Sequence, residues 1–434
     1  MKPASAPPLL ALLFCFASLP AGLSAAPVVA VPGLDWPSYR GPNGDGATRA
    51  PLGKAWGSAG PKQIWKVKAN DGFSSITVSG GVAATLSTRD HEGSAMEHCV
   101  ALEAATGKEL WAMPLKLAMY EGGGDSGDGD NKGGDGPRST PTIADGKVYV
   151  YGSKLDLYCF EATTGKLVWS KDVAAEYQGK NITWSNATSP IIEGKLVMVG
   201  GGGKGAAFLA FDKDSGTLQW QAGDDTITHA TPTVATLLGE RQVIFFMKSG
   251  LTAVSPQNGK ILWQQPFKFN VSTAASPVVF ENIVYCSAGY GVGSAAFEVK
   301  QSGGKYESTE LWRVEGDGTN NHWSTPVAYK GYLYGMFGFK KYGEGPVKCV
   351  DLRTGKEKWS KAGFGPGNVI LAHDQLLALS DKGELVMIAA QPGAYTELAR
   401  ADVLEGKCWS TPTLAGGFIF ARSTKEAACF AVAP

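Results

Sequence analysis

A short pattern recurs along most of this chain of 434 residues and limits the folds that are open to it. It consists of a Gly-Lys or Gly-Thr step, two further residues and a tryptophan, as in residues 107–111. Clear copies end at Trp111, Trp169, Trp220, Trp263 and Trp359, and a degenerate copy ends at Trp312. Successive copies lie 43 to 58 residues apart, and a repeat of this kind indicates an architecture of stacked supersecondary units.

A Ser-Pro or Thr-Pro step opens most of the units and is followed by short apolar runs. These steps end at Pro141, Pro190, Pro232, Pro277, Pro326 and Pro412. The runs are rich in Val, Ile, Tyr and Phe and are bounded by Gly, Asp and Asn, which is typical of strands joined by tight turns. Each unit therefore predicts four short strands, with the tryptophan on the outermost strand, where its ring fills the gap between neighbouring sheets. Four-stranded units of about 40 to 50 residues are the blades of a β-propeller.

The number of units predicts the size and the closure of the ring. Units begin near Phe73, Thr140, Ser189, Thr231, Ser276, Thr325, Asn368 and Thr411, which makes eight. The last unit ends one strand short at Pro434, whereas residues 63–67 carry Trp65 on a strand-like run without partners of its own. We therefore expect an all-β protein, a single eight-bladed β-propeller of four-stranded antiparallel blades over residues 63–434. The N-terminal strand completes the eighth blade, and this closure removes two exposed sheet edges.

The first 25 residues predict a secretory signal peptide. A charged start at Lys2 precedes an apolar run from Leu9 to Leu23, which is followed by the small residues 24–26. The residues before Cys15 lack the small side chains of a lipoprotein acceptor, so we expect no lipid anchor. Residues 26–62 then form an N-terminal extension. These features predict an exported protein, periplasmic or secreted, with no transmembrane span and a monomeric state.

Composition excludes several classes of function. Lys plus Arg and Asp plus Glu both number 40, so no net charge draws the chain to nucleic acid. Only five histidines are present, there is no nucleophile elbow in a strand–helix context, and no CxxC or HxxxH spacing suggests a metal. Four cysteines, Cys99, Cys159, Cys349 and Cys429, occupy what we interpret as one repeat-equivalent strand position, as small buried hydrophobic residues.

An acidic, glycine-rich insert covers residues 121–136. It offers Asp125, Asp128 and Asp130 as weak candidates for metal binding, but the spacing does not match an EF-hand loop. A surface loop is the simpler interpretation, and weak Ca²⁺ binding or a lid over the propeller mouth are the alternatives.

The residues just before each Ser/Thr-Pro step are the best candidates for ligand contact. The first strand of a blade lines the central channel, so residues that precede it converge on one mouth. Aromatic, basic and amide side chains gathered there are typical of a binding site, although a polar, water-filled channel is the competing interpretation. The candidates are Arg138, Trp184, Asn186, His229, His322, Trp323, Lys407 and Trp409.

The repeat resembles that of the PQQ-like, or quinoprotein-type, β-propellers. The resemblance covers about residues 35–434, and the opening Asp35-Trp36-Pro37-Ser38-Tyr39-Arg40-Gly41-Pro42 is similar to the start of many exported members. The family includes quinone-dependent alcohol dehydrogenases and the assembly propeller of the outer-membrane Bam complex. The resemblance is specific for fold and a poor guide to activity, because one scaffold serves many functions.

Three functions remain open on these grounds. We favour a non-catalytic exported binding or scaffold protein, with protein partners in cell-envelope or outer-membrane protein assembly, and we expect no cofactor. The first alternative is a dehydrogenase of alcohols or sugars that uses PQQ and Ca²⁺, although the chain lacks the Cys-Cys pair that caps the cofactor in many members. The second is a carbohydrate-binding propeller with a small-molecule or glycan ligand at the aromatic-rich mouth.

Overall fold

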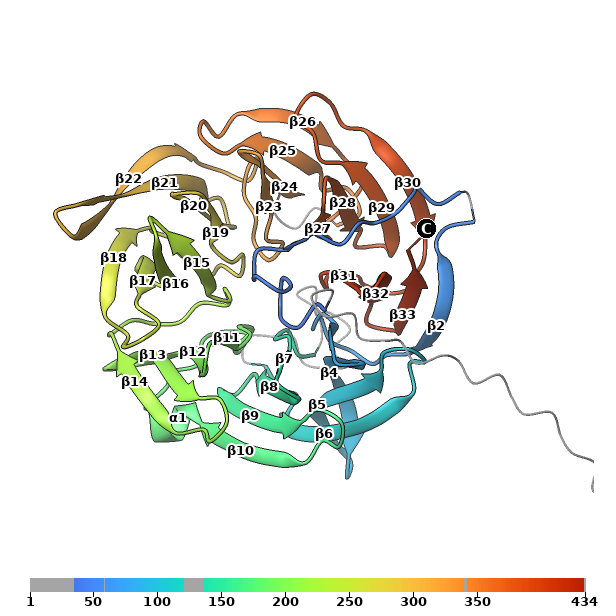
Figure 1. Ribbon diagram of the computed structural model, residues 1–434, viewed down its shortest axis with the longest axis horizontal. Coiled ribbons are helices and arrows are strands. Elements are labelled where there is room, and N and C mark those ends of the chain that lie inside the picture. The colour runs from blue at the N-terminus through green and yellow to red at the C-terminus, as the bar shows by residue number, and fades with distance from the viewer. Residues whose placement is uncertain (1–34, 58, 121–135, 339–341, 433–434) are drawn as a thin grey trace, which may run out of the picture.

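The computed structural model shows eight sheets arranged around a central axis (Figure 1) and describes residues 35–57, 59–120, 136–338 and 342–432. Each sheet contains four antiparallel strands, mostly in chain order from the channel to the rim. The one helix in the described ranges is the single turn α1 (Val173–Glu176). The predicted eight-bladed, all-β propeller is therefore confirmed, while residues 1–34 and most of the insert at 121–136 lie outside the described part.

Blades 1 to 4 follow one another without interruption of the strand order. Blade 1 contains β3 (Thr77–Ser79), β4 (Val82–His91), β5 (Ser94–Glu103) and β6 (Glu109–Leu117). Blade 2 contains β7 (Thr142–Ala144), β8 (Lys147–Tyr151), β9 (Asp156–Glu161) and β10 (Leu167–Asp172). Blade 3 contains β11 (Ile191–Glu193), β12 (Leu196–Gly203), β13 (Ala206–Asp212) and β14 (Leu218–Ala222). Blade 4 contains β15 (Thr233–Leu237), β16 (Glu240–Met247), β17 (Gly250–Val254) and β18 (Ile261–Pro266).

Blades 5 to 8 complete the ring, and the last two receive strands from the N-terminal region. Blade 5 contains β19 (Val278–Phe280), β20 (Ile283–Ala288), β21 (Gly293–Ser302) and β22 (Lys305–Val314). Blade 6 contains β23 (Val327–Tyr329), β24 (Tyr332–Met336), β25 (Val347–Asp351) and β26 (Glu357–Lys361). Blade 7 contains β27 (Asn368–Ala372), β28 (Gln375–Leu379), β29 (Glu384–Ala389) and β30 (Glu397–Asp402), with β1 (Ala47–Thr48) added parallel to β27. Blade 8 contains β31 (Thr413–Ala415), β32 (Phe418–Arg422), β33 (Glu426–Ala431) and β2 (Lys62–Lys68).

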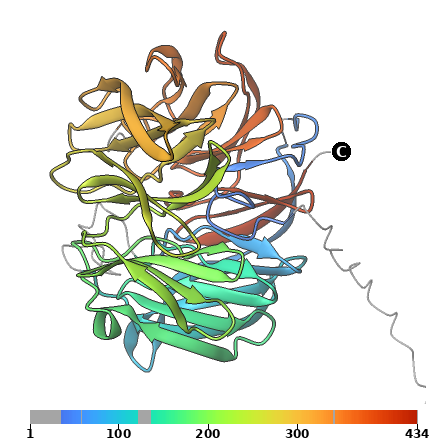
Figure 2. The same ribbon diagram turned by 60° about the vertical axis from the view of Figure 1, so that its left-hand side comes forward.

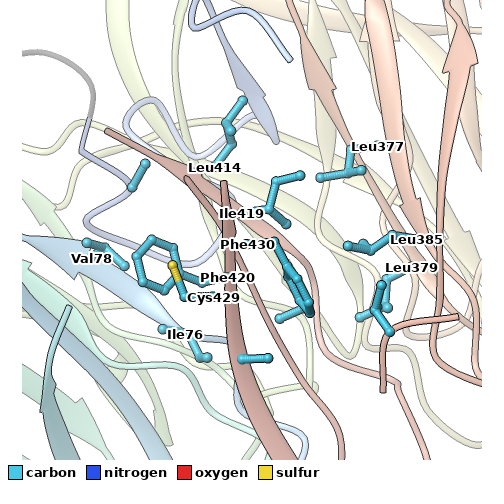
Figure 3. Close-up of a cluster of buried hydrophobic side chains, with 14 of the residues drawn as sticks. Ile76, Val78, Leu377, Leu379, Leu385, Leu414, Ile419, Phe420, Cys429 and Phe430 are labelled. Atoms are coloured by element: carbon cyan, nitrogen blue, oxygen red, sulfur yellow. The ribbon is translucent and has the colours of Figure 1, made fainter. Parts of the chain in front are cut away.

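The N-terminal strand closes the ring as predicted. β2 pairs antiparallel with β33, with Lys62 opposite Ala431 and Trp65 opposite Cys429. Between blades 7, 8 and 1, side chains such as Leu377, Ile419 and Ile76 form one continuous hydrophobic cluster (Figure 3). The seam between the first and last blades is therefore packed as a core. The oblique view shows the sheets standing next to one another (Figure 2).

The repeated tryptophan and glycine meet between neighbouring blades. The Nε1–H of Trp111 donates to the carbonyl of Ala162 in the next blade at 2.8 Å, and its ring lies against Gly165. A Cβ on Gly165 would lie 2.7 Å from the ring atom Cδ2, and its φ of +71° also favours glycine. Four further pairs repeat this ring contact: Trp65 with Gly107, Trp169 with Gly216, Trp220 with Gly259, and Trp312 with Gly355.

Blade 5 departs from this pattern. Its Gly304-Lys305 step lies eight residues before Trp312 instead of four, and β21 and β22 extend as a long hairpin beyond the ring (Figure 1). Trp263 of blade 4 accordingly donates to the side-chain oxygen Oε1 of Gln242 at 2.8 Å.

Hydroxyl groups of the Ser/Thr-Pro steps join the blades at the channel. The amide of Ser75 donates to Thr140 Oγ1 at 3.0 Å, that of Thr140 to Ser189 Oγ at 2.9 Å, and that of Ser189 to Thr231 Oγ1 at 2.9 Å. Thr411 of blade 8 joins the last blade to the first by donating to Ser75 Oγ at 2.9 Å. The repeated hydroxyl residues thus act structurally between blades.

The cysteines are buried free thiols, but one of them is not repeat-equivalent. Cys159, Cys349 and Cys429 each lie opposite the tryptophan of their own blade. In blade 1 it is Ala101 that lies opposite Trp111, two residues after Cys99. The expectation that four cysteines share one position is therefore wrong for Cys99, because Cys99 lies twelve residues before its tryptophan, whereas Cys159 and Cys349 lie ten residues before theirs.

Candidate functional site

One end of the central channel is closed by residues 36–48, which belong to the segment expected to form an N-terminal extension. This segment enters along blade 1, where Trp36 and Val78 exchange backbone hydrogen bonds of 2.9 and 2.8 Å. It continues past blade 2, where the amide of Ile143 donates to the carbonyl of Pro37 at 2.7 Å. We call residues 36–48 the channel segment; it is the blue stretch that crosses the centre of the ring in Figure 1.

Arg40 anchors the channel segment on the far side of the ring. Its buried guanidinium donates to the carbonyls of Thr325 at 2.8 Å and Pro326 at 2.7 Å in blade 6. Burial lowers the pKa of Arg40 from its usual value. The segment then ends as β1 on blade 7, so that it is bonded to blades 1, 2, 6 and 7 and, among the residues that the structure describes, makes the channel a cup with one open mouth.

The open mouth lies at the start of the inner strands and is lined by an aromatic cluster. Phe73, Trp323 and Trp409 precede the inner strands of blades 1, 6 and 8. The ring of Trp409 stacks on Phe73 with 4.8 Å between centroids and on Trp323 with 5.3 Å. Two of the predicted site residues, Trp323 and Trp409, are thus brought together from separate blades.

Loops on the same face extend this cluster. Tyr342, between β24 and β25, stacks on Trp409 at 5.5 Å and is exposed. Tyr290, between β20 and β21, meets His322 edge-on at 5.2 Å, and His322 in turn meets Trp323 at 5.1 Å. We define the aromatic mouth as these six side chains: Phe73, Tyr290, His322, Trp323, Tyr342 and Trp409.

Lys407 supplies a positive charge at the aromatic mouth. Its Nζ lies 5.7 Å from the ring centroid of Trp409, within the range of a cation–π interaction, and the residue is exposed. The carboxylate of Asp381 lies beside the same loops, because its Oδ2 accepts from the amide of Gly343 at 2.7 Å. Burial raises the pKa of Asp381. The surface thus offers broad rings flanked by one cation and one acid.

The other predicted residues form a second group on blades 2 to 4. Arg138 donates from Nη1 to the carbonyl of Trp184 at 2.9 Å, and the Trp184 and His229 rings lie 6.2 Å apart. His229 is buried, and its Nε2 lies 3.0 Å from the carbonyl of Thr183. Burial and then the charge of Arg138 lower the pKa of His229 to about 4, so its ring is neutral at neutral pH.

The loop that carries Trp184 is strained and is held by Asn186. Trp184 and Ser185 have φ of +67° and +60°, a conformation that costs free energy for residues other than glycine. The buried side chain of Asn186 donates to the carbonyls of Tyr151 and Gly152 and accepts from the amide of Thr188 at 3.0 Å. These bonds tie the loop to blade 2, so Asn186 positions its neighbours.

Sequence reasoning missed Tyr290 and Tyr342 as site residues. Both lie in loops between the second and third strands, which reach the same face as the loops before the inner strands. A tyrosine next to a glycine, as in Tyr290-Gly291 and Tyr342-Gly343, was the available signal. The weak metal candidates Asp125, Asp128 and Asp130 lie outside the described residues.

A buried acid beneath Arg138 was also missed. Glu97 accepts from the hydroxyl of Tyr120 at 2.7 Å and from the amide of Ser153 at 3.1 Å. The Arg138 guanidinium lies 5.0 Å from the Tyr120 ring centroid. Burial raises the pKa of Glu97, and the tyrosine hydroxyl opposes that rise. The three side chains hold together the two ends of the chain that flank residues 121–135.

The aromatic mouth is not built as a site for PQQ with Ca²⁺. No three His, Cys, Asp or Glu side chains gather there or elsewhere in the described ranges. A planar cofactor also needs an open aromatic face, whereas three rings already stack against Trp409. We therefore derive no chemistry through this cofactor.

No helix within the described ranges has the length and apolar character needed to span a bilayer.

The fold and the repeat define a propeller of the PQQ-like class. The family model described as outer membrane protein assembly factor BamB matches residues 95–334, more than half of the chain. The chain therefore belongs to this family.

Similarity to individual proteins is low in identity. Tetrathionate hydrolase of Acidithiobacillus ferrooxidans is 25% identical over 228 residues, which are 52% of this chain and 38% of that protein. Outer membrane protein assembly factor BamB of Moranella endobia is 23% identical over 320 residues, 70% of this chain and 62% of that one. The match thus spans less than two thirds of either of these curated relatives.

Solved structures share the fold. BamB from Moraxella catarrhalis superimposes with a TM-score of 0.59 at 14% identity, covering 86% of this chain and 99% of that one. Quinohemoprotein alcohol dehydrogenase ADHIIG from Pseudomonas putida HK5 superimposes with a TM-score of 0.62 at 12% identity, covering 96% and 83%. At such identities the likeness concerns the propeller and not its activity.

Proposed function

We propose that this propeller is a non-catalytic binding protein that holds an extended segment of a protein partner at the aromatic mouth, in the assembly of outer-membrane or other envelope proteins. The observation that carries the proposal is the convergence of six side chains from blades 1, 5, 6 and 8 on the end of the channel opposite the channel segment. Membership of the BamB family supports an assembly role, and the aromatic mouth supplies a place where the partner is held.

The composition of the mouth supports a protein partner. Trp, Tyr and Arg are the residues most enriched where protein interfaces gain their binding energy, and such residues cluster in packed groups. Trp323, Trp409 and Tyr342 form such a group, and exposed Lys407 lies at its edge. Because these rings pack on one another before any partner arrives, little side-chain entropy is lost on binding.

The same packing weakens the alternative of a sugar ligand. A sugar ring stacks on an open aromatic face, but Phe73, Trp323 and Tyr342 already cover much of the Trp409 indole. A peptide, by contrast, can place aliphatic and aromatic side chains against the exposed ring edges and face of Tyr342.

Binding of labelled 15-residue peptides that tile an outer-membrane β-barrel, followed by fluorescence anisotropy, tests the proposal. We expect a subset of peptides to bind the full chain and to bind Trp409→Ala about 30-fold more weakly, which corresponds to a loss of about 2 kcal/mol. Tyr329→Ala is the matched control, because Tyr329 is a partly exposed aromatic on the strand β23 and is not part of the aromatic mouth.

The two alternative functions are tested in parallel on the same protein preparation. A glycan array and reconstitution with PQQ, Ca²⁺ and a dye acceptor probe sugar binding and dehydrogenase activity. Failure of all peptides together with a signal in either assay would overturn the proposal. Peptide binding that Trp409→Ala leaves unchanged would place the partner elsewhere on the ring.

A further inference from the structure

A further tryptophan lies at the mouth end of the channel, on the side of the ring away from the aromatic mouth. Trp184 precedes the inner strand β11 of blade 3, as Trp323 and Trp409 precede those of blades 6 and 8. In a ring of eight blades, blade 3 lies opposite blade 7, which stands between blades 6 and 8 (Figure 1). The loop that carries Trp184 therefore lies across the channel from the pair of Trp323 and Trp409.

The backbone at Trp184 holds an unfavourable conformation that no tight turn requires. Within the part of the chain that the structure describes, Trp184 and Ser185 are the only two successive non-glycine residues with positive φ. Residues such as Asp145 and Lys330 also have positive φ, but each stands before a glycine in a hairpin whose turn demands it. A glycine at position 184 would adopt the same φ without steric cost. The chain thus keeps a bulky side chain at a backbone cost, which is typical of a functional position.

The neighbouring blades hold this loop by its backbone and leave the side chain open. Arg138 donates to the carbonyl of Trp184 at 2.9 Å, and the Nε2 of His229 lies 3.0 Å from the carbonyl of Thr183. The indole of Trp184 is half-buried, and its Nε1–H bonds to no residue that the structure describes. Repeat tryptophans such as Trp111, by contrast, donate this hydrogen to a carbonyl of the next blade. Trp184 therefore offers an indole N–H to a molecule at the mouth.

The ring of Trp184 is also less covered than the rings of the aromatic mouth. Its contact with His229 is loose, with 6.2 Å between centroids and 48° between the ring planes. Trp409, in comparison, stacks on Phe73 at 4.8 Å and on two further rings. An extended peptide presents side chains and backbone carbonyls along its whole length, so that it can contact both the ring and the N–H of Trp184.

We propose that Trp184 is a second anchor for the protein partner, so that one extended segment crosses the mouth and is held on both sides of the ring. An apolar side chain of the segment packs on the indole of Trp184, and one backbone carbonyl of the segment accepts the indole N–H. This inference rests on the proposed function for the class of partner, and it adds the second contact and the direction in which the segment runs. Two anchors on one segment strengthen each other, because the second contact forms within a complex that already exists.

The test uses the 15-residue peptide that binds the full chain most tightly among those that Trp409→Ala weakens. Trp184→Ala should weaken the binding of this peptide about 20-fold, as expected for a tryptophan at the centre of an interface. Trp184→Phe should weaken it about five-fold, because it keeps a ring but loses one neutral hydrogen bond. The N-terminal and C-terminal halves of the peptide should each respond to only one of Trp184→Ala and Trp409→Ala.

A glycine substitution separates binding from packing. Trp184→Gly should bind the peptide as weakly as Trp184→Ala but keep the melting temperature of the wild type, because relief of the positive φ offsets the lost ring contact. Phe280→Ala is the control and should bind the peptide like the wild type. Phe280 is also a half-buried aromatic residue, but it lies at the end of β19, away from the mouth.

The outcomes distinguish this inference from the proposed function. Peptide binding that Trp409→Ala weakens and Trp184→Ala leaves unchanged would overturn the second anchor and leave the proposed function standing. A lower melting temperature of Trp184→Gly would make Trp184 a packing residue, and wild-type affinity in Trp184→Phe would refute the hydrogen bond. If no peptide binds the wild type, both proposals fail.

Discussion

At the scale of the residue, the glycine that stands four residues before the repeat tryptophan meets two demands at once. Its backbone adopts a positive φ, and its missing side chain leaves room for the indole of the preceding blade. Gly146 and Gly165 of blade 2 separate these demands. Their φ values are +73° and +71°, but only Gly165 lies against Trp111, whereas a Cβ on Gly146 would meet nothing within 4 Å.

Alanine substitutions at these two glycines should therefore differ in cost. Gly146→Ala should lower the free energy of unfolding by about 1 kcal/mol, which is the cost of a positive φ for a residue with a Cβ. Gly165→Ala also forces a Cβ into Trp111, which adds about 1 to 3 kcal/mol of overpacking. Chemical denaturation of both variants measures the difference. Equal free energies of unfolding would show that the indole moves aside without cost.

The pH dependence of stability should carry the signature of His229. Its folded pKa of about 4 lies below the unfolded value of about 6.5, so protonation favours the unfolded chain. The stability that the neutral ring contributes is present above pH 6.5 and is lost as the pH falls toward 4, by about 3 kcal/mol.

Comparison with His229→Gln separates this effect from that of the buried carboxyl groups. Burial raises the pKa of those groups, so their contribution to stability has the opposite pH dependence. Urea denaturation of both proteins between pH 4 and 7 should give curves that converge as the pH falls. Parallel curves over that range would contradict the depressed pKa.

Single residues also show how much of the site could be predicted from the sequence. The roles of the tryptophan and the glycine of the repeat can be predicted from the sequence, because their spacing is regular and their packing is local to one pair of blades. Cys99 was misplaced, because the similar residues around it hid a spacing to the tryptophan that is two residues longer than in the other blades. Tyr290 and Tyr342 were missed, because a loop residue becomes part of a site only when the ring brings distant blades together.

At the scale of the element, the channel segment was not foreseen at all. It contains only two residues of strand, Ala47 and Thr48, and it is held by contacts between backbone groups and one arginine. Such a segment has no apolar periodicity from which it could be predicted. The blades, by contrast, could be predicted from the sequence, because each one is a local meander of strands built from short apolar runs.

Arg40 is the point at which the channel segment should be most vulnerable. Arg40→Leu leaves the carbonyls of Thr325 and Pro326 without their donor and should cost about 3 kcal/mol, because hydrogen bonds to a charged group are strong. Limited proteolysis with mass spectrometry should then detect cleavage within residues 36–48 before any other part of the ring. Cleavage elsewhere first would mean that β1 and Trp36 hold the segment without Arg40.

At the scale of the whole molecule, Arg422 joins the last blade to the first. Its fully buried guanidinium donates from Nη1 to Thr85 Oγ1 at 3.0 Å and from Nη2 to the carbonyl of Asn70 at 2.6 Å. Burial lowers the pKa of Arg422 to about 10, so the group remains charged at neutral pH. The seam is thus stabilised by an ionised side chain that bonds to neutral acceptors.

Loss of that side chain should weaken the closure of the ring. Arg422→Met keeps the aliphatic length but leaves buried acceptors unpaired, and we expect a loss of about 3 kcal/mol in the free energy of unfolding. Arg353→Met is the control, because Arg353 is exposed and pairs with Glu281 at 3.4 Å on the surface. Calorimetry that finds similar melting temperatures for both variants would show that β2 alone closes the ring.

The pairing of β2 with β33 can form only after nearly all of the chain has been synthesised. Lys66 and Glu426 meet across this pair although 360 residues separate them. Contacts of such long range form late, because the chain between them must first be made and ordered. A polypeptide without β33 leaves β2 unpaired and an open edge on β32, so this single late contact reports that the ring has closed.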